Sequence, residues 1–213
     1  MMHTWFECKI RYEKIMDNGM NKKVTEPYLV DALSFTEAEA RIIEEMIPYI
    51  SGEFTVSDIK RANYSELFCS DDPSADRWFK CKLWFITLDE KSGAEKKTAT
   101  HVLVQAADLR DAVKKLDEHM KGSLADYVIA SMAETAIMDV YPYTSNETEY
   151  NDERTVPDPK SKIEKTVAQF IAGLHEGQEC EITVSGKPMI LYRTASRTTV
   201  KPKPEKEDSD GPR

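Results

Sequence analysis

Tryptophan and cationic side chains alternate along two short segments of the sequence, and this alternation is its most evident chemistry. Residues two apart in a β-strand point to the same side, so each segment would present its rings and cations on one face. The residues of this candidate binding face are Trp5, Lys9, Arg11, Trp78, Lys80, Lys82 and Trp84. Aromatic rings beside cations stack bases and neutralise phosphates in several modules that bind single-stranded nucleic acid. The sequence therefore makes single-stranded nucleic acid a candidate ligand.

Signatures of other chemistry are weak. The chain has no Walker loop, GxGxxG turn, HExxH helix or GxSxG elbow. Acidic pairs at Glu44-Glu45 and Asp71-Asp72 offer ligands for a divalent cation together with distant carboxylates, but solvated surface charge is the commoner role of such pairs. The histidines fall in a terminus, a strand, a helix end and a loop, with no sign of convergence: His3, His101, His119 and His175. We therefore predict no catalytic, cofactor-binding or metal-binding residue and favour a non-enzymatic protein.

The net charge argues against a protein that binds duplex DNA. The 213 residues carry a formal net charge of -9, and neither the part before residue 145 nor the part after it is basic. Proteins that bind a duplex through its phosphates usually carry a basic footprint. No duplex DNA is expected as a partner.

The cysteines and the hydropathy pattern bear on the compartment. The four cysteines are widely spaced and form no CxxC pair, so neither a zinc site nor a disulfide framework is predicted: Cys8, Cys69, Cys81 and Cys180. No apolar stretch approaches the length of a membrane span, and no signal sequence is evident at the N-terminus. A cytoplasmic location without a membrane partner is expected.

An internal repeat underlies these two segments. The sequence Trp5-Phe6-Glu7-Cys8-Lys9-Ile10 returns 73 positions later as Trp78-Phe79-Lys80-Cys81-Lys82-Leu83, and residues 28–46 align without a gap to 102–120. Self-similarity of this kind indicates duplicated structural units. The sequence predicts two ββαβ units, about residues 5–68 and 78–141, within one duplicated α+β domain over residues 1–145.

Each unit has local signals for its elements. A strand from Trp5 or Trp78 leads to a turn at 17–19 or 91–93, and a second strand follows. A helix then opens at the capping sequences 34–37 and 108–111, and an alternating segment closes the unit. We expect an antiparallel or mixed sheet with both helices on one face and the other face open.

The C-terminal third differs in composition. Residues 146–162 are rich in turn formers and charge, which predicts a linker. Residues 163–194 show helical spacing followed by a hairpin pattern, which predicts an appendage that docks on the duplicated domain or on a partner. Residues 195–213 are polar and proline-rich and are expected to be disordered.

The function that these features favour is that of a binding or adaptor protein. Large exposed aromatic residues usually mark an interface, so the candidate binding face is expected to bind a macromolecule. The candidates are a protein partner, a second copy of the chain and single-stranded nucleic acid. Cover of the face by the C-terminal helix is a further alternative. A self-associating structural protein is the second functional class, and a metal-dependent enzyme acting on nucleic acid is the remotest.

Several segments together resemble a known family. These are residues 5–9, 25–32, 34–40 and 54–60, which are similar to a domain-of-unknown-function family of Bacteroidetes bacteria and their phages. The resemblance covers about residues 3–143 and leaves the C-terminal extension outside. It implies a bacterial or phage protein and implies no activity or catalytic residue.

Overall fold

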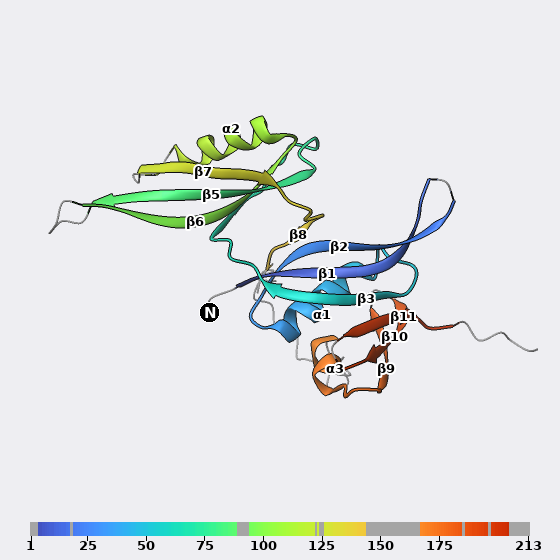
Figure 1. Cartoon of the computed structure of the whole chain (residues 1–213). Coiled ribbons are helices and arrows are strands. Elements are labelled where there is room, and N and C mark those ends of the chain that lie inside the picture. Colours follow the sequence, from blue (N-terminus) through green and yellow to red (C-terminus); the bar gives the residue numbers. More distant parts are fainter. Residues whose placement is uncertain are drawn as a thin grey trace, which may run out of the picture. The chain divides into compact units, whose positions relative to one another are not determined.

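The computed structural model describes residues 4–17, 19–88, 94–121, 123, 126–143, 167–184, 186–195 and 197–204. The chain packs as two compact units, residues 1–60 with 141–213 and residues 61–140, which we call the first unit and the second unit (Figure 1). No helix in the described ranges is long and apolar enough to cross a membrane.

The first unit is built on a long antiparallel hairpin of β1 (Thr4–Ile15) and β2 (Asn21–Ala32). Helix α1 (Phe35–Met46) and strand β3 (Phe54–Arg61) follow. The period of two along β1 buries Phe6, Cys8 and Ile10 in a core that also takes the apolar side of α1. Gly19, in the hairpin turn, has a φ of 74°, a conformation that favours glycine.

The second unit repeats this order of elements. Strands β5 (Arg77–Leu88) and β6 (Glu95–Ala106) form a long antiparallel hairpin, and α2 (Leu109–Met120) and β7 (Asp126–Glu134) follow. Figure 1 shows α2 lying over one face of this sheet. The core beneath it includes Phe79, Cys81 and Leu83 of β5 and Leu116 of α2.

Both helices begin at the capping residues that the sequence predicted. The Ser34 hydroxyl accepts from the Glu37 N–H at 3.2 Å, and the Glu37 carboxylate accepts from the Leu33 N–H at 2.8 Å. The Asp108 carboxylate accepts from two N–H groups at the start of α2. These reciprocal contacts satisfy donors that a helix leaves unpaired at its N-terminus.

The α+β class is confirmed, but the strands lie in two sheets instead of one. In the described part of the chain the orders are β8-β2-β1-β3-β11-β10-β9 and β4-β6-β5-β7. The short strands that close the two repeats change sheets: β4 (Glu66–Phe68) pairs in parallel with β6, and β8 (Val140–Tyr141) lies beside β2. Each sheet has its own core, with α1 packed in the first and α2 in the second.

The hairpin registers of the two units correspond. Trp5 pairs with Asp31 in the first unit as Trp78 pairs with Gln105 in the second, in agreement with the sequence offsets of 73 and 74. The internal duplication itself stays a prediction from the sequence.

The C-terminal appendage belongs to the first unit. Helix α3 (Val167–Gly173) packs against α1 and buries Val167 and Ile171 in the first core. Strands β9 (Glu179–Val184) and β10 (Lys187–Arg193) form the expected hairpin. The expected linker at 146–162 lies outside the described residues.

One expectation for the C-terminus is wrong over a short stretch. Residues 198–202, inside the segment expected to be disordered, form β11 (Thr198–Pro202) between β10 and β3. Thr198 and Val200 are fully buried, and pairing on both sides satisfies the backbone of a segment too polar to fold alone. Residues 205–213 of the expected tail lie outside the described residues.

Candidate binding face

The candidate site lies on the side of the second sheet that faces away from α2. Residues paired across antiparallel strands share a face, so Lys82 of β5 lies beside His101 of β6, and Lys97 lies opposite Ile86. We call the accessible part of this side the lysine face. It consists of Lys80, Lys82, Trp84, Lys97 and His101, with the ring of Tyr64 beside Lys80.

The lysines of this face lie against aromatic rings. The Lys82 Nζ atom is 4.6 Å from the centroid of the Trp84 ring, and the Lys80 Nζ atom is 5.6 Å from that of Tyr64. Such contacts stabilise by roughly 0.5 to 1 kcal/mol at exposed sites. Within the described ranges no ion pair joins Lys80, Lys82 or Lys97 to a carboxylate. Their charges are available to an anion.

His101 adds a titratable group between the lysines. Partial burial, and then repulsion from Lys80 and Lys82, lowers its pKa below the usual 6.5. Its carbonyl oxygen accepts from the Ser65 N–H at 2.8 Å and from the Ser65 hydroxyl at 3.0 Å. These two hydrogen bonds hold Ser65 against β6. Tyr64 is the residue before Ser65, and its ring thereby lies beside Lys80 at the edge of the face.

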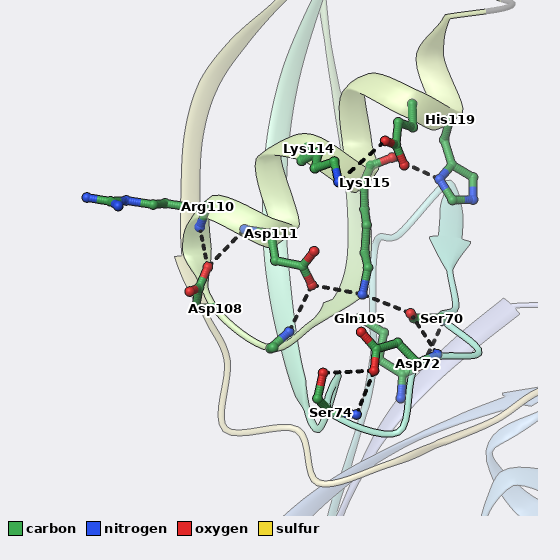
Figure 2. A network of polar contacts seen from close by, with 12 residues as sticks. Ser70, Asp72, Ser74, Gln105, Asp108, Arg110, Asp111, Lys114, Lys115 and His119 are labelled. Atoms are coloured by element: carbon green, nitrogen blue, oxygen red, sulfur yellow. Dashed lines mark hydrogen bonds and ion pairs between the residues drawn. The ribbon is translucent and has the colours of Figure 1, made fainter.

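A polar network at the start of α2 holds the segment between β4 and β5 (Figure 2). The Lys115 ammonium donates to the Asp111 carboxylate and to the Ser70 hydroxyl, each at 2.8 Å. The Ser70 N–H donates to the Gln105 side chain at 3.0 Å, and the Asp72 carboxylate accepts from the N–H and hydroxyl of Ser74. The network ties this segment to α2 and to β6, which is one of the two strands that carry the face.

Ser70 and Lys115 are not arranged as a serine nucleophile and its general base. A lysine that activates serine must accept the hydroxyl proton. Here Lys115 donates to Ser70 and is ion-paired with Asp111. The hydrogen bond from Lys115, and then that from the Ala107 N–H, lowers the pKa of Asp111. These contacts are therefore structural, since Lys115 holds Ser70 against α2.

The side of the first sheet that carries Trp5, Lys9 and Arg11, which we call the tryptophan side, differs from the lysine face in its charges. The Asp58 carboxylate lies 3.5 Å from the Lys9 ammonium and 2.9 Å from that of Lys60. The hydrogen bond from Lys60 is the main cause of a lowered pKa at Asp58. Leu29, opposite Glu7 on this side of the sheet, is fully buried. Lys9 therefore has a carboxylate partner that Lys80 and Lys82 lack in the described structure, and Trp5 and Arg11 lie on the same side as Lys9.

Trp78 does not offer an open ring. Only 3% of the residue is exposed, and Leu103, opposite Lys80 on the same side of the sheet, is fully buried. The Trp78 carbonyl oxygen accepts from the N–H and the hydroxyl of Thr135, at 2.8 and 2.9 Å. The expectation of an open face is thus wrong at its Trp78 end, because strand periodicity gives the side to which a residue points but not what covers it.

The C-terminal helix does not lie on the tryptophan side of the first sheet. Helix α3 packs against α1, and Val167 and Ile171 enter the core that Phe6, Cys8 and Ile10 form. The appendage therefore docks at the helix-bearing face and the β3 edge of this sheet.

A partly buried ion pair joins the appendage to α1. The Arg193 Nη1 atom lies 3.0 and 2.8 Å from the two Glu39 carboxylate oxygens and 2.6 Å from the Thr198 hydroxyl. Glu39 and Arg193 border a cavity of about 520 Å³, which Arg197, Ser57 and Asp58 also line. Sequence reasoning missed this pair because its members are 154 positions apart, and no local pattern joins them.

The remaining candidate residues are dispersed. His119 stacks on Phe68 with ring centroids 4.5 Å apart, and its Nδ1 atom lies 2.9 Å from the Lys115 carbonyl oxygen. Burial is the main cause that raises the pKa of Glu44. No three His, Cys, Asp or Glu side chains within the described ranges are placed to hold a metal ion together. Cys8 and Cys81 are buried, and burial raises the pKa of each to about 12.

Residues 4–143 match a known family of domains. The chain belongs to the family described as Domain of unknown function (DUF4494), whose model matches residues 4–143. This match confirms the resemblance to a family of unknown function, while the bacterial or phage source stays a prediction. The C-terminal extension lies outside the match. Comparisons with curated proteins and with solved structures found no match.

Proposed function

We propose that this chain is a non-enzymatic binding protein whose lysine face takes single-stranded nucleic acid. The observation that carries the proposal is the pair of contacts at Lys80 and Lys82, where each ammonium lies over an aromatic ring and has no carboxylate partner in the described structure. A base can stack on the Trp84 ring while the lysine beside it moves to the adjacent phosphate. Four free cysteines suit the reducing cytoplasm, which is the compartment we propose.

The magnitudes favour a modest affinity. One or two stacked bases contribute about 1 to 3 kcal/mol each, and Lys80, Lys82 and Lys97 offer three phosphate contacts. Three contacts to a single strand give a slope of about -2 for the logarithm of the association constant against that of salt concentration. We expect dissociation constants of about 10 to 100 µM at low salt, which corresponds to roughly 5.5 to 7 kcal/mol.

The ligand is single-stranded because a base must leave the helical stack to meet the ring. The residues between 61 and 140 are acidic overall, with 14 acidic and 11 basic residues. A duplex would therefore meet only the local cations of the face and none of the long-range attraction that duplex binders use. We expect duplex DNA of the same length to bind at least tenfold more weakly.

The test is fluorescence polarisation of a labelled 12-nucleotide random single strand at 50 and 200 mM salt. Lys82→Ala and Trp84→Ala are each expected to weaken binding fivefold or more, whereas Trp84→Phe retains most of it because a ring remains. The matched control is Lys9→Ala, at the same position of the first unit, where Asp58 already pairs with the lysine. Equal losses from Lys9→Ala and Lys82→Ala would contradict the proposal.

If the single strand does not bind, a protein partner or a second copy of the chain is left as the occupant of the lysine face. Sedimentation equilibrium over a hundredfold range of concentration distinguishes them. A mass that rises with concentration and is restored to that of a monomer by Trp84→Ala would replace the proposal with self-association through the same face.

A further inference from the structure

Strands β3 and β7 hold the same place in their units but have different neighbours. Each follows the helix of its unit and pairs with the first strand of the hairpin. In the first unit β3 is also paired on its outer side with β11 of the C-terminal extension. In the second unit β7 ends the sheet, and no strand of the described chain pairs with its outer edge.

The contact of β11 with β3 shows what such an edge accepts. Thr198, Thr199 and Val200 pair antiparallel with Val56, Thr55 and Phe54. The alternate residues Thr198 and Val200 are fully buried. On the other side of the strand, the hydroxyl oxygens of Thr199 and Thr55 lie 3.1 Å apart.

A charge pair completes this contact. The Lys201 Nζ atom lies 3.5 Å from a carboxylate oxygen of Glu53, the residue before β3. The occupant of the β3 edge is therefore a short extended segment with small β-branched residues at alternate positions, followed by a cation.

The outer edge of β7 offers matching chemistry. At the offset of 73, Phe54 and Val56 correspond to Tyr127 and Ile129, which are partly buried against the second core. Glu53 corresponds to Asp126, the first residue of β7. The exposed Val128, at 51%, takes the place of Thr55.

The first half of β7 has the regular geometry that strand addition needs. Residues Asp126 to Ile129 pair without a break with Ile86 to Leu83 of β5, and the register shift comes only after them, between Lys82 and Leu83. Bulges and short strands are common means of blunting a free edge, and here the register shift lies outside residues 126–129.

We propose that the outer edge of β7 at residues 126–129 is a docking site for an extended segment of a partner protein. That segment would add antiparallel, as β11 does on β3, with small β-branched residues at alternate positions and a lysine or arginine facing Asp126. In a pairing of β7 with the β7 of a second copy, the antiparallel register about Ala130 is disfavoured, because it sets Asp126 opposite Glu134.

The probe is a labelled, end-blocked peptide with the sequence of residues 197–204, Arg-Thr-Thr-Val-Lys-Pro-Lys-Pro, added to the full chain and followed by polarisation. The peptide is expected to bind with a dissociation constant below 1 mM, and Asp126→Lys is expected to weaken this binding at least fivefold. A peptide carrying Lys201→Glu is expected to prefer the Asp126→Lys protein over the unchanged one. Thermal unfolding checks that each variant is folded.

The matched control is Glu53→Lys, which alters the equivalent position on the edge that β11 occupies. Loss of peptide binding in this variant and not in Asp126→Lys would show that the peptide replaces β11 on β3, and would overturn the proposal. Absence of binding at 1 mM would do the same. Hydrogen exchange is expected to slow at residues 126–129 when the peptide is present. Lys82→Ala is expected to leave peptide binding unchanged, which would show that the peptide site is independent of nucleic-acid binding.

Discussion

Replacement of Arg193 with methionine is expected to destabilise the first unit by about 2 to 3 kcal/mol. Arg193 holds the Glu39 carboxylate through Nη1, and only 10% of the Glu39 side chain is exposed. Loss of one partner of a buried pair costs about 3 to 5 kcal/mol, because the other charge stays buried without compensation. The Arg193 side chain is 30% exposed, so water reaches the site and the expected loss falls below that range, to about 2 to 3 kcal/mol.

The assay is urea unfolding at pH 7, in a double-mutant cycle with Glu39→Gln. The two single replacements are expected to be non-additive by about 1 to 3 kcal/mol, since the residues contact each other directly. Arg197→Met is the matched control, because Arg197 borders the same cavity but is exposed, and it is expected to change the free energy of unfolding by less than about 0.5 kcal/mol. Additive effects, or equal losses from Arg193→Met and Arg197→Met, would refute the reasoning.

Three further predictions follow from single contacts. Asp108→Ala is expected to cost about 1 kcal/mol, since its carboxylate accepts from two N–H groups of α2; an unchanged melting temperature would contradict this. Although burial acts to raise it, hydrogen bonds from Tyr12, Tyr28 and Lys14 give Glu26 a pKa below 4.5, so its stabilisation is present above pH 4.5 and is lost as the pH falls through the lowered pKa. Glu26→Gln is expected to flatten that part of a plot of unfolding free energy against pH, and an unaltered plot would count against the assignment. In the folded protein a thiol reagent at pH 8 is expected to label the exposed Cys69 and spare Cys8, which mass spectrometry of the labelled peptides checks.

Local features of the fold were predictable from the sequence. The period of two along β1 and β5, the hairpin turns, and the capping residues Ser34 and Asp108 all depend on neighbours a few positions apart. These signals gave the hairpin, the helix and the following strand of each unit, and the core-facing sides of β1 and β5, but they did not separate β4 from β3.

Features that depend on distant partners were not predictable. The exchange of β4 and β8 between the sheets, and the pairing of β11 with β3, are decided by which edges lie free after the hairpins have formed. The polar composition of residues 198–202 indicates disorder until a strand on each side supplies hydrogen bonds.

The candidate site was predictable in part. Periodicity placed Lys80, Lys82 and Trp84 on one side of a strand, as the structure has them. It did not distinguish the accessible end of that side from the end at Trp78, because burial depends on packing from outside the strand. Nor did it show that Lys9 has a carboxylate partner and Lys82 has none in the described structure, a difference that rests on Asp58 in another strand.

The most direct test of the account follows the emission of Trp84 alone. The chain has three tryptophans, so Trp5→Phe with Trp78→Phe leaves Trp84 as the single reporter, with circular dichroism to verify folding. Titration with an unlabelled 12-nucleotide single strand at 50 mM salt is expected to quench this emission, and 200 mM salt is expected to reverse the quenching. Binding detected by polarisation with no change in Trp84 emission would place the ligand elsewhere and contradict the account.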